Sequence, residues 1–162
     1  YSGHIIYAIR RMFRGVSQLT IDIKGRFSLP ARYRNLLRDK SDALVLTIDI
    51  QDKCLLMYPY CEWEIIEKRL DNLPSLNVAA RRVQRLLIGH ATEVNLDPHG
   101  RILVPTPLRD YANLEKQIVL LGQGRKFEIW DSLHWEEQRQ IWINKSIAPD
   151  EDIPEELENI TL

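Results

Sequence analysis

The sequence predicts an α+β fold in which one structural unit is used twice, as a pseudo-twofold body with flanking helices. The first observation is a repeated phrase: LTIDIKGRFSLPARYR begins at Leu19, and VNLDPHGRILVPTPLR begins at Val94, 75 residues later. The second is that the segments after the two phrases have the same order of strand-like and helix-like patterns. The third is that no Gly/Ser-rich linker separates the halves. Such repetition is typical of a duplicated supersecondary unit.

Residues 16–29 have the pattern of a β-hairpin. VSQLTID alternates apolar and polar residues, and RFSLP resumes after Gly25. Asp22 suits the first position of a type I turn, and Gly25 suits a following position with positive φ. Asp97 and Gly100 repeat this chemistry in the second phrase. We expect all four residues to be turn-forming, because these positions need no ligand to explain them.

A proline ends the second strand of each predicted hairpin. Pro30 and Pro105 stand where a helix can start, and ARYRNLL and PLRDYANL then have the pattern of short amphipathic helices. An apolar hairpin follows in each half: ALVLTID with KCLLMYP, and QIVLLGQ with KFEIWD. Each repeat is therefore predicted to contain strands followed by a helix and a further hairpin.

A helix is predicted after each of these hairpins, with a tryptophan at matching places in YCEWEIIEKRL and SLHWEEQRQIW. We expect the tryptophans to be core and helix-packing anchors; they are Trp63, Trp130, Trp135 and Trp142. A further helix, NVAARRVQRLLIGHA, is predicted between the halves, and Asn77 is a suitable N-cap for it. One arc of this helix is predicted to pack, namely Ala79, Ala80, Val83, Leu86 and Leu87. The opposite side presents Arg81, Arg82 and Arg85.

The expected domain organisation has five segments. These are an N-terminal extension (1–11), a first repeat (12–75), a connecting helix (76–92), a second repeat (93–146) and an acidic tail (147–162). PDEDIPEELENITL carries six acidic residues and no basic one, so we expect the tail to lack ordered structure.

Charge is divided unevenly along the chain. Residues 1–148 hold 22 basic and 17 acidic residues, a net charge of +5. Between residues 10 and 38, eight basic residues face a single acidic one, Asp22. This concentration is the electrostatic footprint of a protein that binds a polyanion, and a merely solvated surface would have the same composition.

The sequence also favours a cytoplasmic location. No apolar run approaches the roughly 20 residues that a membrane span needs. The apolar patch at residues 5–9 is followed by Arg10 and Arg11, not by the small residues of a signal-peptide cleavage site. Cys54 and Cys61 match neither a disulfide framework nor a CxxC motif. We expect neither export nor contact with a membrane.

An enzymatic reading of the repeated aspartates is disfavoured. Two pseudo-twofold carboxylates can share a proton, but the aspartic protease pattern needs a small hydroxyl residue and Gly directly after each Asp. Ile23 and Pro98 stand there instead. The chain lacks GxSxG, HExxH and P-loop motifs. Its histidines have no metal-ligand spacing; they are His4, His90, His99 and His134. We expect no catalytic residue, no metal, no cofactor and no small-molecule substrate.

Arg26 and Arg101 stand directly after the turn glycines, where neither turn type nor strand propensity asks for arginine. One partner that suits each guanidinium is the preceding aspartate, Asp22 or Asp97, in a structural ion pair. The other is a phosphate or the edge of a guanine, with which the planar guanidinium forms two parallel hydrogen bonds. The basic surroundings favour nucleic acid. The candidate DNA-binding residues are Arg14, Lys24, Arg26, His99 and Arg101.

The motifs MFRG, DIKGR, RRVQRLLIGHA and KFEIWD, in this order from Met12, resemble the MraZ family of bacterial transcriptional regulators. The resemblance implies two AbrB-like, swapped-hairpin halves in one small β-barrel, and ring-shaped homo-oligomers. It also implies binding to repeated DNA boxes in the promoter of the cell-division and cell-wall operon. The family's D-x-x-x-R signature falls on residues 22–26 and 97–101. The family begins at the Met of MFRG, so we expect residues 1–11 to be a non-native or extra extension.

The resemblance therefore predicts a sequence-specific DNA-binding regulator of transcription, not an enzyme, that is cytoplasmic and associated with the nucleoid. Its expected partners are double-stranded promoter DNA and further copies of itself. Two alternatives stay open. One is an AbrB-like antitoxin that binds DNA and neutralises a toxin through the acidic tail, although such antitoxins usually carry one hairpin unit. The other is an oligomeric scaffold with no role on DNA.

Overall fold

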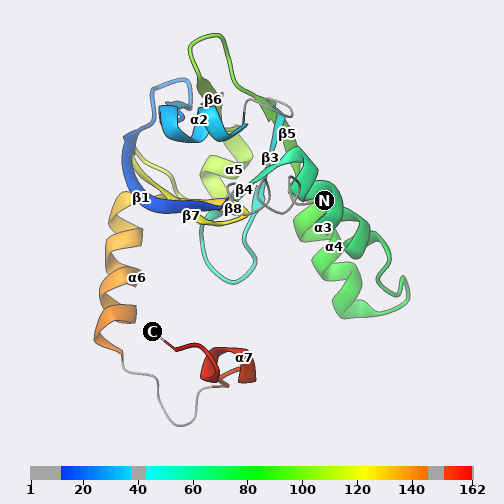
Figure 1. Ribbon diagram of the computed structural model, residues 1–162. Coiled ribbons are helices and arrows are strands. Elements are labelled where there is room, and N and C mark those ends of the chain that lie inside the picture. The colour runs from blue at the N-terminus through cyan, green and yellow to red at the C-terminus, as the bar shows by residue number, and fades with distance from the viewer. Residues whose placement is uncertain (1–11, 38–42, 146–151, 162) are drawn as a thin grey trace, which may run out of the picture. The chain divides into compact units, whose positions relative to one another are not determined.

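The computed structural model describes residues 12–37, 43–145 and 152–161, and Figure 1 shows its helices and strands. The expected N-terminal extension lies outside these residues. The chain divides into two compact units after Ser132. The mixed α+β class predicted from the sequence is confirmed.

Within the described residues, the first unit contains eight strands, and every pairing between them is antiparallel. They are β1 (Phe13–Thr20), β2 (Arg26–Ser28), β3 (Ala43–Ile48), β4 (Leu55–Pro59), β5 (Thr92–Asn95), β6 (Arg101–Leu103), β7 (Gln117–Gly124) and β8 (Lys126–Asp131). Six of them form a sheet in the order β1-β7-β8-β4-β3-β5, and β2 and β6 form a separate two-stranded ladder. No ladder joins the two sheets into a closed barrel in the part of the chain that the structure describes.

The simple hairpin expected over residues 16–29 is wrong, because β1 and β2 do not form a ladder with each other. β1 pairs with β7, from Phe13 opposite Gly124 to Thr20 opposite Gln117, and β2 pairs with β6. Both partners belong to the second repeat. The turn residues still form a turn, since Asp22 O accepts from Gly25 N at 2.9 Å, but β2 then joins a separate ladder in which Phe27 is buried. Pairing is thus set by long-range packing, which local alternation does not reveal.

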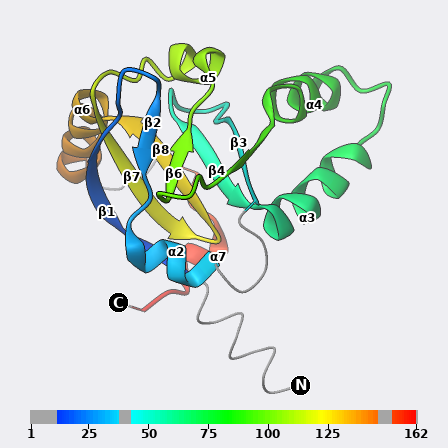
Figure 2. The same cartoon turned by 90° about the horizontal axis from the view of Figure 1, so that it is seen from above.

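The main hydrophobic core lies between the six-stranded sheet and the β2–β6 ladder. Phe27 of β2 and Ile102 of β6 are 1% and 0% exposed, and they belong to one buried cluster with Phe127 and Ile129 of β8. Figure 2 shows β2 and β6 lying over the strands β7 and β8. Phe13 stacks on Phe127 with ring centroids 4.2 Å apart. Burying side chains of this size contributes about 1.5–3 kcal/mol each, so the burial of Phe27 and Ile102 holds β2 and β6 firmly on the larger sheet.

Two short helices follow the prolines, as predicted. They are α2 (Ala31–Leu37) and α5 (Thr106–Tyr111), and Figure 2 shows them at opposite ends of the β2–β6 ladder. Tyr33 and Leu108 anchor them, each 2% exposed. Both helices are therefore packed against the same hydrophobic core as the β2–β6 ladder.

A pair of longer helices, α3 (Tyr60–Asp71) and α4 (Val78–His90), packs beside β3 and β4. The predicted N-cap is confirmed, because Asn77 Oδ1 accepts a hydrogen bond from Ala80 N at 2.9 Å. The predicted polar face is also confirmed, since Arg81, Arg82 and Arg85 are exposed. Ala79 was expected on the packed arc but is exposed, because it lies in the first turn, before the helix reaches its neighbours.

The second unit contains most of α6 (Ser132–Asn144) and all of α7 (Glu155–Glu158). Trp135 is buried, as expected. Trp142 is 46% exposed, so it is not a core residue, but its ring lies edge-on to that of Trp135 with centroids 6.1 Å apart. The acidic tail was expected to be unordered, yet it contains α7. Pro154 precedes this helix and three glutamates lie in its first turn, which suits the positive end of a helix dipole. None of the described helices is long and apolar enough to cross a membrane.

Candidate nucleic-acid interface

The first candidate loop, residues 22–26, is held together by one aspartate. Asp22 Oδ1 accepts hydrogen bonds from the backbone N–H groups of Lys24 at 3.0 Å and Arg26 at 2.9 Å. Asp22 O accepts from Gly25 N at 2.9 Å. Gly25 has a φ of 88°, which residues with a Cβ rarely adopt. The structural roles predicted for Asp22 and Gly25 are thus seen directly in the geometry of the turn.

The second candidate loop, residues 97–101, repeats this construction. Asp97 Oδ1 accepts from His99 N at 2.8 Å and from Arg101 N at 2.9 Å. Asp97 O accepts from Gly100 N at 2.9 Å, and Gly100 has a φ of 74°. Two sequences that share only Asp, Gly and Arg at these positions therefore build the same loop.

Each loop arginine forms an ion pair with the aspartate of its own loop. Arg26 Nε lies 2.8 Å from Asp22 Oδ2, and Arg101 Nε lies 2.8 Å from Asp97 Oδ2. Each guanidinium forms its ion pair through Nε, and the two arginine side chains are 29% and 31% exposed. The terminal nitrogens of the guanidinium make no hydrogen bond to the described residues. The ion pair expected as one alternative is present, and it leaves the planar fork able to donate to an anion as well.

The loop hydrogen bonds also keep both aspartates ionised. The backbone N–H of Arg26 is the largest cause that lowers the pKa of Asp22 below its ordinary value, and the Arg26 side chain adds to it. The backbone N–H of Arg101 lowers the pKa of Asp97 in the same way. A carboxylate that is ionised at neutral pH cannot act as a general acid, so the two loops do not form a proton-sharing catalytic pair.

The β2–β6 ladder has an inner and an outer face. Phe27 lies opposite Ile102 in the register, and both side chains are buried in the core. Since side chains alternate along a strand, the residues before and after these two point the other way. The outer face therefore carries Arg26, Ser28, Arg101 and Leu103.

This outer face places the two loop arginines on one surface. Arg26 lies opposite Leu103, and Arg101 lies opposite Ser28, so the arginines are diagonal neighbours about 7 Å apart along the strands. Ser28 is exposed, and Leu103 is 51% exposed. Sequence reasoning missed both residues, because their place beside the arginines depends on the pairing of β2 with β6.

The two loops lie at opposite ends of this ladder, because β2 and β6 run antiparallel. Lys24 and His99, which were predicted as DNA-binding residues, are exposed at the two loop tips. Ile23 stands beside Lys24 and is 98% exposed. An unsupported apolar side chain of this size at a basic loop tip suits contact with a sugar or a thymine methyl group.

Arg14 lies apart from the other candidate residues. It is exposed near the start of β1, whereas the first loop begins after Thr20 at the end of that strand. Six residues of strand correspond to roughly 20 Å. The structure therefore does not bring Arg14 next to Lys24 and Arg26, although all three are close in the sequence.

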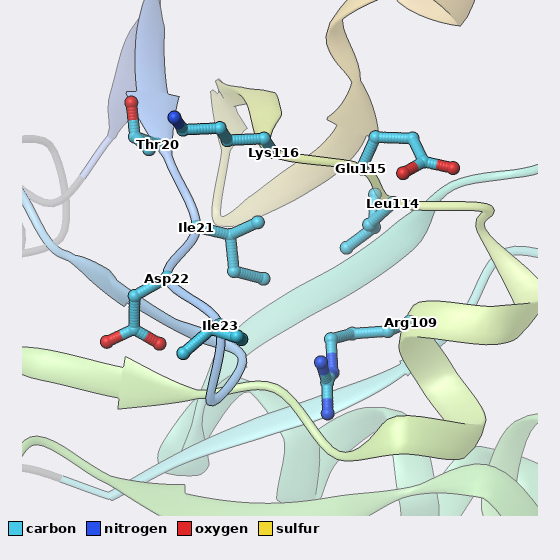
Figure 3. A pocket seen from close by; sticks show the side chains of 8 residues that line it. All are labelled: Thr20, Ile21, Asp22, Ile23, Arg109, Leu114, Glu115 and Lys116. Carbon is cyan, nitrogen blue, oxygen red and sulfur yellow. The ribbon is translucent and has the colours of Figure 1, made fainter.

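A pocket of about 540 Å³ opens beside the first loop. Its lining includes Ile21 and Asp22 of the first repeat, and Arg109 and Lys116 of the second. Figure 3 shows Arg109 extending from α5 toward the loop that carries Asp22. The surroundings of the first loop thus include a basic side chain of the other repeat, which proximity in the sequence did not reveal.

A second group of polar side chains lies away from the loops. Ligand atoms of Asp49, Cys54 and Glu128 lie within 4.8 Å of one another. Burial raises the pKa of Cys54, and its thiol donates to Asp49 Oδ2 at 3.5 Å. Metal ions bind the thiolate, so a thiol that is held protonated is a poor ligand. We assign no metal to this group.

Comparisons with known proteins agree with the duplicated architecture. A family model described as "MraZ protein, putative antitoxin-like" matches residues 12–86 and again 87–153. A protein of Halorhodospira halophila (strain DSM 244 / SL1) named "Transcriptional regulator MraZ" is 53% identical over 152 residues, which cover 93% of this chain and 100% of that protein. Proteins with the same name and the same coverage from Legionella pneumophila (strain Corby) and Coxiella burnetii (strain Dugway 5J108-111) are 50% and 49% identical.

Proposed function

The chain belongs to the MraZ family, and from this premise we propose that it is a sequence-specific DNA-binding regulator of transcription. It has no enzymatic activity, and it acts in the cytoplasm in association with the nucleoid. The names of its relatives support the regulatory role. The ionised state of Asp22 and Asp97 supports the absence of acid–base catalysis at the loops.

One observation carries the proposal: the outer face of the β2–β6 ladder presents Arg26 and Arg101 together. A two-stranded ribbon fits the major groove of B-DNA, which is about 12 Å wide. A guanidinium there can donate bidentately to guanine O6 and N7, or to a phosphate. On the same face Leu103 lies opposite Arg26 and Ser28 lies opposite Arg101, and these two residues complete the contact surface.

The other basic residues are assigned to the DNA backbone. Lys24 and His99 stand at the loop tips, where they flank the ribbon and can contact phosphates on either side of the groove. Arg14 lies too far from the ribbon to share its base pairs, so we assign it to a phosphate further along the duplex. Because Asp22 and Asp97 hold the loops rigid, little conformational entropy is lost on binding.

We further propose that ring-shaped homo-oligomers bind repeated boxes in the promoter of the cell-division and cell-wall operon, as the family resemblance implies. One ribbon offers few basic groups, and such a contact is weak at physiological salt. Joining several ribbons raises overall affinity by about 10² to 10⁴. We also propose that the halves are AbrB-like swapped hairpins in one small barrel, since β1 and β2 both pair with strands of the second repeat.

The proposal is tested by titrating the protein against a labelled promoter fragment and a scrambled fragment of the same composition. We expect at least about 10³-fold tighter binding to the promoter. Fragments with one, two and three boxes should bind with increasing affinity, and about 5 base pairs inserted between boxes should abolish the gain by turning one box to the other side of the duplex. Equal affinity for promoter and scrambled DNA would contradict sequence-specific regulation.

A second candidate function is that of an antitoxin, which the description of the matching family model favours. The acidic residues of the tail, including Glu155, Glu156 and Glu158 of α7, would then bind a basic toxin. Neighbouring genes discriminate between the two functions. A cell-wall and division cluster favours the regulator, whereas a small ribonuclease gene next to this one favours the antitoxin.

A further inference from the structure

Each of the repeated sequence phrases ends in an arginine that the DNA interface does not use. These are Arg34 at the end of α2 and Arg109 in α5, 75 residues apart. The structure places each of them on the turn glycine of the opposite repeat. A Cβ added at Gly25 would lie 2.6 Å from Arg109 Cζ, and a Cβ added at Gly100 would lie 2.5 Å from Arg34 Nη1. The relationship is therefore reciprocal and crosses from one repeat to the other.

Arg109 is fixed in this position by hydrogen bonds to the strand end that also binds the first loop. Gly25 O accepts from Val104 N at 2.8 Å, and Val104 O accepts from Arg109 Nε at 3.0 Å. Arg109 Nη2 donates to Thr106 Oγ1 at 2.9 Å. The guanidinium thus covers the backbone of Gly25 while Val104 links the two residues.

Arg34 has the same place on the second loop but fewer contacts. Gly100 O accepts from Leu29 N at 3.0 Å, which repeats the link made by Val104. Arg34 Nε, however, is buried and has no hydrogen-bond partner among the described residues. An unpaired buried donor is costly, so Arg34 holds its loop less firmly than Arg109 does.

We propose that Arg34 and Arg109 are positioning residues, each of which holds the DNA-binding loop of the opposite repeat. The guanidinium occupies the space that a side chain at the glycine would fill, and its contact with the glycine restricts movement of the loop. Because each loop is held by a residue of the other repeat, Arg26 and Arg101 keep a fixed separation on the ladder. The part of this inference that concerns DNA rests on the proposed function.

Amide hydrogen exchange of the full chain tests the positioning role without DNA. Arg109→Ala should speed exchange in residues 22–26 by about tenfold, the effect of losing roughly one net hydrogen bond, and leave residues 97–101 unchanged. Arg34→Ala should do the reverse, with a smaller effect. Arg109→Lys keeps the positive charge but loses the planar guanidinium, so amide exchange in residues 22–26 should be intermediate between wild type and Arg109→Ala. This variant keeps the test decisive if Arg109→Ala does not fold. Arg69→Ala, on the exposed side of α3, is the matched control and should change neither loop.

The proposal requires each arginine variant to speed exchange only in the loop of the opposite repeat. Equal acceleration of both loops by Arg109→Ala would show a general loss of stability, and no acceleration of either loop would show that the arginine does not brace it. Either result overturns the proposal.

A double-mutant cycle with promoter DNA tests whether Arg109 acts through Arg26. Arg109→Ala should weaken binding in the wild-type background and have little further effect in the Arg26→Ala background. Additive losses would mean that Arg109 contacts DNA by itself, which overturns the positioning role. If Arg26→Ala does not weaken binding at all, the proposed DNA contact fails, and hydrogen exchange alone decides whether Arg109 positions the loop.

Discussion

Asp22 binds Arg26 through both carboxylate oxygens: Oδ1 accepts a hydrogen bond from the backbone N–H of Arg26 at 2.9 Å, and Oδ2 forms an ion pair with Arg26 Nε at 2.8 Å. Asp97 and Arg101 form the same arrangement. One carboxylate therefore fixes both the loop and the direction of the guanidinium that projects from it. The D-x-x-x-R spacing follows from this geometry, because only the fourth residue after the aspartate closes both contacts.

Replacing the turn glycine should destabilise the protein. Gly25→Ala places a Cβ at a φ of 88° and 2.6 Å from Arg109 Cζ, so we expect a loss of about 1–3 kcal/mol in the free energy of unfolding. Gly89→Ala is the matched control, because a Cβ there meets no atom within 4 Å. Gly89 lies inside α4, so its replacement should stabilise the protein by about 0.5–1 kcal/mol. Urea denaturation measures both, and equal effects would contradict the loop geometry.

The aspartate contacts predict a loss of stability in acid. The pKa of Asp22 and of Asp97 is lowered from 3.8 in the folded protein, so their contribution is fully present above that pH and is lost as the pH falls below it. Asp22→Asn with Asp97→Asn should therefore lower the free energy of unfolding at pH 7. Denaturation at pH 7 and at about pH 3 should show the gap between this variant and wild type narrowing in acid. A gap that widens in acid would mean that the carboxylates are not stabilising in their ionised form.

The register of the β2–β6 ladder predicts opposite results for two neighbouring residues. Leu103 points outward and is 51% exposed, whereas Ile102 is fully buried. Leu103→Asp should leave the fold intact and lower affinity for DNA by more than about tenfold, because a negative charge would face the phosphates. Ile102→Asp should unfold the protein, since the core offers the charge no partner. Circular dichroism and a binding titration distinguish the two, and a reversed pattern would show that the register is wrong.

The sequence predicted the elements that depend on local chemistry. Asp22 and Gly25 specify their turn within four residues, and Asn77 caps its helix through the N–H three residues later. Pro30 and Pro105 precede α2 and α5, as expected from their fixed φ. In each case the interacting groups are neighbours along the chain.

What the sequence could not predict depends on contacts between the repeats. β2 pairs with β6 because Phe27 and Ile102 share a core, and nothing in either strand alone specifies this partner. Arg14 was grouped with Arg26 because they are close in sequence, but the length of β1 separates them. The sequence also does not indicate that Arg109 contacts Gly25, because these two residues are 84 positions apart in the chain although they are neighbours in space.

The central claim is that Arg26 and Arg101 contact DNA from the outer face of the ladder. Fluorescence anisotropy with a labelled promoter fragment tests it most directly, with Arg26→Ala, Arg101→Ala and the charge-matched control Arg69→Ala. Each loop variant should lose about 1–3 kcal/mol of binding free energy, roughly 5- to 150-fold in affinity, and should lose much less on scrambled DNA. Their melting temperatures should stay close to that of wild type, because a partly exposed ion pair contributes about 0–1 kcal/mol to stability. Loop variants that bind the promoter as tightly as Arg69→Ala and wild type would contradict the account.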